Sequence, residues 1–299
     1  MFKPVVDVAI GILLHKNKVL VGWRQANQHQ GNKHEFPGGK VETHEQPVDA
    51  CRREIFEEVG VGLSDWHCFD VIQHEYDDVV VVLHLFSAYV PDTLLDLIQQ
   101  PWSWYHREEL QQLNFPAANH SILARLSWPN IIKISSTEIV PKKEELIYWR
   151  PEQTNSSEGV SLQFELDSHH YASYIVNLEH YLQLDPEQQN KIGSIHLKQS
   201  QLMQLSKGDL ICGRRYIAAC HDLVSIQQAH KIGCDAILIS PVQATQTHPD
   251  QAPLGWERFE HLAQRSHLPV FALGGIHRSM LDLAKKHGAY GIAGIRNIK

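Results

Sequence analysis

Three glutamates in one short segment have the spacing of a metal-binding helix face. Glu54, Glu57 and Glu58 lie at positions i, i+3 and i+4, so a helix would place their carboxylates on one face. Like charges this close repel one another unless a cation neutralises them, and Mg²⁺ takes carboxylates, water and phosphate oxygens as ligands. The spacing therefore indicates a site for a hard divalent cation, Mg²⁺ or, in its place, Mn²⁺. For the glutamates alone, a solvated acidic helix face is the alternative.

The flanking residues predict the helix and a glycine turn that would position the glutamates. Pro47 suits a first helical turn, and Gly60 is where the helix is expected to end. Four apolar residues between them recur at helical spacing: Val48, Cys51, Ile55 and Val59. Upstream, Gly38 and Gly39 allow a close approach of the backbone, and the Gly38 carbonyl could supply one more oxygen ligand.

The complete pattern resembles the Nudix box. The residues that match its fixed positions are Gly39, Glu45, Arg53, Glu54, Ile55, Glu57, Glu58, Gly60 and Val61. The resemblance extends over about the first 128 residues and is closest to the MutT type, the 8-oxo-dGTP diphosphatases. It implies a catalytic set of Glu54, Arg53 and Glu57, in which Glu54 is the base for the attacking water. Metal ligands would be Glu54, Glu57, Glu58 and Gly38.

The same resemblance implies a nucleotide site. The residues that match the family's nucleotide contacts are Arg24, His29, Glu35, Phe36, Pro37, Gly38 and Asn119. Asn119 could select the base, because its amide offers a donor and an acceptor side by side. Both pair with the O6 acceptor and N7–H donor of 8-oxoguanine, whereas guanine presents two acceptors. The alternative is a turn or cap residue after Pro116.

The expected activity is Mg²⁺-dependent hydrolysis of an oxidised purine nucleoside triphosphate, 8-oxo-dGTP, to the monophosphate and pyrophosphate. This activity would cleanse the nucleotide pool and avoid mutation during DNA replication. One position departs from the MutT pattern, because Ser103 stands where that family has a further acidic metal ligand in a late loop. Either Glu108 or Glu109 takes that role, or the metal site is weaker.

The elements expected in the first part of the chain form a mixed sheet with helices on its faces, an α/β/α sandwich. Its strands are expected at residues 5–14, 18–23, 66–74, 79–90 and 103–106, and a closing helix at 119–126. Ser127-Trp128-Pro129-Asn130 breaks this pattern. We therefore expect a Nudix domain over residues 1–128 and a second domain over residues 129–299.

The second domain has eight short apolar segments, most of them separated by helical stretches. They are residues 131–134, 145–149, 172–176, 194–197, 216–219, 236–239, 270–273 and 291–295. This alternation predicts a closed parallel (β/α)8 barrel of the TIM type. The barrel would be shortened, since about 170 residues are fewer than the fold usually needs. The connection from Ile134 to Glu145 is too short for a full helix, so the first helix is expected to be missing.

The second half resembles thiamine-phosphate synthase, most clearly over about residues 190–299. The matching pieces include Ile195-His196-Leu197, Ser240-Pro241-Val242, Leu254-Gly255-Trp256 and Ala272-Leu273-Gly274-Gly275-Ile276. The resemblance implies that a Gly-Gly turn after the seventh strand cradles a phosphate. The expected phosphate-binding residues are Ser240, Thr245, Thr247, Gly274 and Gly275. Alternatively, Gly274-Gly275 is only a tight turn between strand and helix.

The metal-binding acids of the synthase are missing here. The chain has Asn177-Leu178 for an Asn-Asp pair, Gln201 near the later aspartate, and His248 for a lysine. We therefore expect a barrel that binds a phosphorylated thiamine-related ligand, or that only packs against the first domain. Two alternatives stay open. The barrel could make thiamine phosphate while the first domain clears damaged diphosphates, or it could be a sensor or docking module.

Composition narrows the remaining possibilities. The net charge of −7 argues against stable nucleic-acid binding. No apolar run approaches the roughly 20 residues of a membrane span. The five cysteines form an odd number without metal-type spacing, and residues 1–4 lead directly into a strand. A cytoplasmic protein without a membrane segment is therefore expected.

Overall fold

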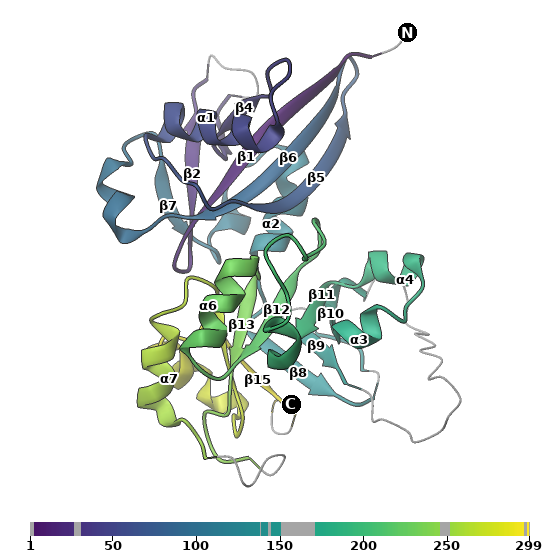
Figure 1. Cartoon of the computed structure of the whole chain (residues 1–299), viewed down its shortest axis with the longest axis vertical. Coiled ribbons are helices and arrows are strands. Elements are labelled where there is room, and N and C mark those ends of the chain that lie inside the picture. The colour runs from purple at the N-terminus through teal and green to yellow at the C-terminus, as the bar shows by residue number, and fades with distance from the viewer. Residues whose placement is uncertain are drawn as a thin grey trace. The chain divides into compact units, whose positions relative to one another are not determined.

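The computed structural model consists of two compact units. It describes residues 3–26, 31–137, 139–142, 145–150, 171–245, 252–295 and 298 (Figure 1). The first unit comprises Met1–Trp128 and Ile211–Gly213, and the second Pro129–Leu210 and Arg214–Lys299. Within the first unit, Cys68 and Cys212 form a disulfide with Cα atoms 5.4 Å apart, a pair that the cysteine spacing did not predict.

A seven-stranded mixed sheet forms the first unit. Five strands have the order β3-β2-β1-β6-β5, while β4 pairs with β1 and β7 with β2. The strands are β1 (Val5–His15), β2 (Lys18–Arg24), β3 (Lys33–Glu35), β4 (Gly38–Lys40), β5 (His67–Glu75), β6 (Val80–Tyr89) and β7 (Ser103–His106). The pair β1 and β6 is parallel, and the other pairs are antiparallel. The mixed sheet expected from the sequence is therefore confirmed.

Each face of this sheet carries its own apolar cluster. Successive residues of a strand point to opposite faces, so Leu13 packs with α1 (Pro47–Val59) and Ile12 with α2 (His120–Leu126). In Figure 1, α1 lies across the strands of the sheet. As predicted, α1 buries Cys51, Ile55 and Val59 and ends at Gly60, whose φ of 81° lies in the left-handed region. Three 3-10 helices complete the unit: η1 (Asp92–Leu97), η2 (Leu110–Gln112) and η3 (Ala117–Asn119).

The second unit is the closed parallel barrel that the sequence predicted. Its strands follow the circular order β10-β11-β12-β13-β14-β15-β8-β9. They are β8 (Ile131–Ser135), β9 (Glu145–Trp149), β10 (Tyr174–Asn177), β11 (Ser194–Leu197), β12 (Tyr216–Cys220), β13 (Ala236–Ile239), β14 (Val270–Leu273) and β15 (Gly291–Gly294). The helices are α3 (Leu178–Tyr181), α4 (Pro186–Lys191), α5 (Gln199–Leu202), α6 (Leu223–Ile232), α7 (Gly255–Ala263) and α8 (Leu281–Lys286), with 3-10 turns η4 (Tyr171–Ser173) and η5 (Arg278–Met280).

The described residues between β8 and β9 contain no helix, which agrees with the expected loss of the first one. Glu145 lies at the start of β9, and its side chain is 4% exposed. The Arg278 guanidinium from η5 binds it at 2.7 Å. A buried carboxylate needs such a partner, because the uncompensated charge would otherwise lie in an apolar environment.

Replacing Arg278 with methionine is expected to lower the free energy of unfolding by about 2–4 kcal/mol, because it leaves Glu145 buried without a cation. Chemical denaturation measures the loss. The double variant Arg278→Met/Glu145→Leu removes both charges and should recover at least half of it. An unchanged stability of the single variant would contradict the pairing.

Within the described ranges, no helix is both long enough and apolar enough to cross a membrane.

Candidate active site

Strand β4 brings the glycine turn against α1. Its pairing with β1 places Gly39 opposite Ala9, and the Gly38 N–H donates to Glu58 Oε2 at 2.9 Å. A Cβ added at Gly39 would lie 2.3 Å from both Cδ and Oε1 of Glu54. A side chain at position 39 would therefore displace the Glu54 carboxylate from its place beside the strand.

Arg53 links the helix to the loop before it. Its guanidinium binds both Glu45 oxygens, with Nε–Oε1 at 3.1 Å and Nη2–Oε2 at 2.9 Å. It also donates to Glu54 Oε1 at 2.7 Å and to the Lys40 carbonyl at 3.2 Å. These hydrogen bonds raise the pKa of Arg53 and lower the pKa of Glu45. The Glu54 carboxylate is thus held between Arg53 and the Gly39 backbone.

Negative charge accumulates beside this contact. Burial raises the pKa of Glu58, and the neighbouring Glu54 and Glu35 carboxylates raise it further, against the Gly38 N–H and Arg24. Arg24, at the end of β2, contacts Glu35 of β3 through Nε and Oε2 at 2.7 Å. The site therefore carries more acidic charge than its protein cations compensate, which is the setting in which a bound cation is stabilised.

The carboxylate and carbonyl oxygens of the site suit a hard divalent cation, but the Glu54, Glu57 and Glu58 carboxylates do not point to one common position. Glu54 and Glu58 reach the Gly38–Gly39 strand, whereas the Glu57 side chain is 57% exposed and lies 3.7 Å from Arg53. Over the described residues, no three His, Cys, Asp or Glu side chains form a ready metal site. Metal binding would require Glu57 to turn towards the other two carboxylates.

Ser103 stands where the MutT type has its late-loop acidic residue. Ser103 lies on β7 opposite Val21 of β2. Of the two acids considered as substitutes, Glu109 accepts the His106 N–H at 2.6 Å within its own turn. The preceding residue, Trp102, contacts the helix of the site: its Nε1–H donates to the backbone carbonyl of Glu58 at 2.9 Å.

The residues expected to read the base lie on the α2 side of the sheet. Phe36 is buried in that cluster and stacks on Phe115 with ring centroids 4.9 Å apart. Asn119 ends η3 and is only 8% exposed, yet its side chain does not cap α2 and has no hydrogen-bond partner among the described residues. The Pro37 carbonyl accepts the Gly11 N–H at 2.9 Å. His29 lies outside the described residues.

In the barrel, the loops after β13 and β14 pack directly against each other. Gly274 and Gly275 have left-handed φ angles of 96° and 66°, and an added Cβ at Gly274 would lie 2.7 Å from Pro241 Cα. Ser240 lies on the same loop as Pro241, with its Oγ 3.4 Å from His221 Nδ1. The glycines are thus needed for the turn itself. Thr245 is described, but Thr247 lies outside the described residues.

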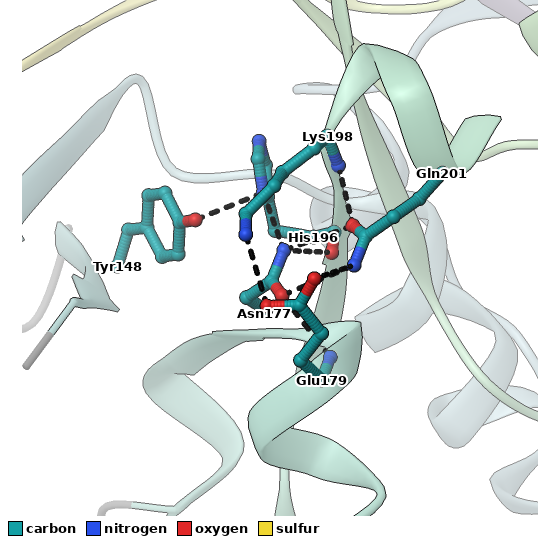
Figure 2. A network of polar contacts seen from close by, with 6 residues as sticks. All are labelled: Tyr148, Asn177, Glu179, His196, Lys198 and Gln201. Carbon is teal, nitrogen blue, oxygen red and sulfur yellow. Dashed lines mark hydrogen bonds and ion pairs between the residues drawn. The ribbon is translucent and has the colours of Figure 1, made fainter. Parts of the chain in front are cut away.

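A polar network at the ends of β9, β10 and β11 was largely missed by sequence reasoning (Figure 2). It consists of Tyr148, Asn177, Glu179, His196, Lys198 and Gln201. The sequence had identified Asn177 and Gln201 only as departures from the synthase. Their position at the carboxyl ends of predicted barrel strands was the one signal that could have found the others.

Replacing Arg53 with lysine is expected to lower kcat by about 10-fold or more, because an ammonium cannot bind Glu45 in two-point fashion while also holding Glu54. Steady-state hydrolysis of a nucleoside triphosphate, the substrate class that the sequence resemblance implies, measures the effect. Arg52→Lys is the matched control, since Arg52 pairs with Asp49 away from the glycine strand, and its rate should stay within about twofold. Equal rates for both variants would contradict the positioning role.

The NUDIX domain family model matches residues 8–125. The 8-oxo-dGTP diphosphatase of Escherichia coli is 31% identical over 129 residues, which cover 40% of this chain and 95% of that protein. This chain belongs to the NUDIX family. Its first unit is a Nudix domain of the nucleotide pyrophosphohydrolase kind. A MutT crystal structure from Methanosarcina mazei aligns with 42% of this Nudix chain and 95% of its own length, at 23% identity and a TM-score of 0.37.

The barrel of this Nudix hydrolase has relatives of another kind. The thiamine monophosphate synthase family model matches residues 169–298. The putative thiamine-phosphate synthase 2 of Aquifex aeolicus is 40% identical over 77 residues, covering 26% of this chain and 41% of that protein. The matched region thus spans about two-fifths of that relative. The chain is a fusion of a Nudix hydrolase domain with a thiamine-phosphate synthase-like barrel.

Proposed function

We propose that the Nudix domain hydrolyses 8-oxo-dGTP to 8-oxo-dGMP and pyrophosphate with Mg²⁺. The observation that carries this proposal is the Glu54 carboxylate held between Arg53 and the Gly39 backbone, with Glu58 bound to Gly38 beside it. The named activity of the Escherichia coli relative supports the choice of substrate. The proposed role is the removal of oxidised purine nucleotides before DNA synthesis uses them.

The metal would be held by Glu54, Glu57, Glu58 and the Gly38 carbonyl. When bound, Mg²⁺, or Mn²⁺ in its place, supplies neutralisation of negative charge on the phosphate oxygens. Glu54 accepts a proton from the attacking water, and Arg53 fixes the carboxylate through the 2.7 Å hydrogen bond to its Oε1. Arg24, whose Nε pairs with Glu35 at 2.7 Å, would help to hold the nucleotide.

Asn119 would provide the preference for the oxidised base. Its buried side chain has no partner among the described residues, so both amide groups are available. The amide pairs with O6 and N7–H of 8-oxoguanine. With guanine, its carbonyl faces the N7 acceptor, and a buried unpaired polar group costs about 1–3 kcal/mol. Phe36 and its stacked neighbour Phe115 supply an apolar wall on the same side of the sheet.

The test is hydrolysis in ¹⁸O-labelled water with product analysis by mass spectrometry. Attack of water on the β-phosphorus should give unlabelled 8-oxo-dGMP and a pyrophosphate that carries one ¹⁸O atom. Label in the monophosphate would instead place the attack on the α-phosphorus. Release of orthophosphate and a nucleoside diphosphate would contradict the proposed reaction.

For the barrel, we propose binding of a phosphorylated thiamine-related ligand. The family match over residues 169–298 and the close-packed Gly274–Gly275 turn beside Ser240 favour it. Calorimetric titration of the full chain with thiamine phosphate should show saturable binding that Ser240→Ala weakens. If no binding is found, the barrel has a docking or stabilising role. If a thiamine-requiring strain grows when it carries only this gene, the barrel instead makes thiamine phosphate.

A further inference from the structure

His34 lies in a cluster of aromatic rings on the α2 side of the Nudix sheet. It stands opposite Trp23 in the pairing of β3 with β2, and the two rings meet edge to face with centroids 4.9 Å apart. Its ring centroid is also 5.9 Å from that of Tyr105 on β7 and 5.8 Å from that of Phe115. Phe115 in turn stacks on Phe36. His34, which is not one of the residues that match the family's nucleotide contacts, thus contacts the apolar wall proposed for the base.

Two hydrogen bonds join His34 to the segment that leads to this wall. The His34 N–H donates to the Asn114 carbonyl at 2.7 Å, and the Asn114 N–H donates to His34 Nδ1 at 3.2 Å. The imidazole nitrogen thus takes the place that a backbone carbonyl would have between paired strands. Both bonds use the backbone of Asn114 and are independent of its side chain. Loss of the Nδ1 acceptor would leave the Asn114 N–H without this partner.

The second of these bonds defines which ring nitrogen carries the proton. A backbone N–H can only donate, so Nδ1 is an acceptor and the proton of the neutral ring is on Nε2. Burial lowers the pKa of His34 below its ordinary value, which keeps the ring neutral at neutral pH. In the imidazolium form both ring nitrogens carry protons, and the Nδ1–H would face the Asn114 N–H. Protonation therefore replaces a hydrogen bond with a contact between two donors.

The charged neighbours of His34 do not offset this change. Those on β2 and β3 occupy positions that alternate with the two aromatic rings, so they face the other side of the sheet. They are Arg24, Lys33 and Glu35. On β7 the titratable neighbour is the phenol of Tyr105, and residues 113–118 contain no titratable side chain. Within these described segments, no carboxylate faces the ring to stabilise its protonated form.

The segment joined to His34 also carries the residue proposed to read the base. Asn119 follows Asn114 by five residues and ends η3, where its N–H donates to the Pro116 carbonyl at 3.0 Å. The position of this turn relative to β3 depends on the contacts made at Asn114 and Phe115. Hydrogen bonds weaken steeply as their geometry departs from the optimum. A shift of the segment would therefore reduce the discrimination by Asn119 before it abolished binding.

We propose that His34 is a positioning residue for base recognition: its neutral ring holds Asn114, and thereby Asn119, where 8-oxoguanine is distinguished from guanine, and its protonation cancels the distinction. The preference for the oxidised base is then present at neutral and alkaline pH and is lost in acid. This inference rests on the proposed base-reading role of Asn119, and it adds the residue that makes this role depend on pH.

The main test measures the binding of 8-oxo-dGMP and dGMP to the full chain by calorimetry, from about pH 8 down to about pH 5, the range in which histidine titrates. Titration of the phosphate is common to both nucleotides, so it cancels in the ratio of their Kd values. We expect the preference for 8-oxo-dGMP to fall about 10-fold over this range, as for the loss of one buried hydrogen bond. The measurement does not require hydrolysis.

Two substitutions separate the role of His34 from a general effect of acid. His34→Asn keeps an acceptor, Oδ1, near the position of Nδ1 but does not titrate, so its preference should stay high at every pH. His34→Leu has no acceptor, so its preference should be low at every pH. A wild-type preference that is constant with pH, or that falls equally in His34→Asn, would overturn the inference and leave the role of Asn119 standing. A wild-type chain that never distinguishes the two nucleotides would overturn both.

A second measurement tests the contact itself without a nucleotide. In NMR spectra of the full chain with ¹⁵N-labelled histidine, the His34 signals are those missing from His34→Asn, and Nδ1 should carry no proton while the ring is neutral. Exchange of the Asn114 amide hydrogen should become faster as His34 is protonated. A proton on Nδ1 of the neutral ring, or an Asn114 amide that does not respond to this titration, would contradict the positioning role.

Discussion

Replacing Glu54 with glutamine is expected to lower kcat for 8-oxo-dGTP by about 1,000-fold, within the range typical of a lost general base. The amide fits the space beside Gly39, where the Glu54 carboxylate is packed. It cannot accept a proton from water, and it loses the charge that Arg53 binds at 2.7 Å. Pyrophosphate release at saturating Mg²⁺ and nucleotide measures the loss.

The control for this variant lies on the same helix. Asp49 pairs with Arg52 in the first turn of α1, away from the glycine strand. Asp49→Asn should leave kcat within about twofold, because an exposed ion pair contributes little. Thermal melting of both variants checks that α1 still folds. A Glu54→Gln enzyme that keeps more than a tenth of the activity would contradict the role of Glu54.

Asn119→Leu is expected to reduce the preference for 8-oxo-dGTP over dGTP by about 10–100-fold, corresponding to the roughly 1–3 kcal/mol of a buried polar mismatch. Leucine keeps the size of the side chain but removes the donor and the acceptor. Turnover of dGTP should change little, since the metal residues are untouched. The ratio of the two kcat/KM values is the measurement.

Asn114→Leu is the matched control for this variant. Asn114 lies in the same segment as Asn119, but its Nδ2 donates to the Asn32 carbonyl at 3.2 Å. Loss of this hydrogen bond should lower the stability of the domain and leave the preference for 8-oxo-dGTP over dGTP unchanged. Equal loss of preference in both variants would show that Asn119 acts through packing and not through the base.

The sequence predicted the local features of the site well. The helix of the box, its apolar stripe and its end at Gly60 follow from helical spacing and from the left-handed conformation that glycine permits. The binding of Arg53 to Glu45 could not be derived from spacing alone, because it depends on how the loop between them returns to α1. The exposure of Glu57 could not be derived from spacing either, because helical periodicity predicts only that Glu57 lies on the same helix face as Glu54 and Glu58.

In the barrel, too, the sequence predicted the local elements but not the contacts between distant residues. Short apolar runs predicted its strands, because both faces of a barrel strand are buried. The contact of His196 with Tyr148 depends on the pairing of β10 with both β9 and β11, which places the ends of the three strands together. Residues 48 positions apart in sequence carry no local signal for such a contact. Likewise, the expected start of α2 at Asn119 shifts to His120, because Asn119 ends the preceding 3-10 turn.

The most direct test of the account is pyrophosphate release from 8-oxo-dGTP and dGTP, measured side by side with Mg²⁺ and then with chelator. The account predicts metal-dependent release from both nucleotides and a higher kcat/KM for 8-oxo-dGTP. Metal-dependent hydrolysis without preference would remove the base-reading role of Asn119. Hydrolysis that persists with chelator, or none of either nucleotide, would contradict the carboxylate site on α1.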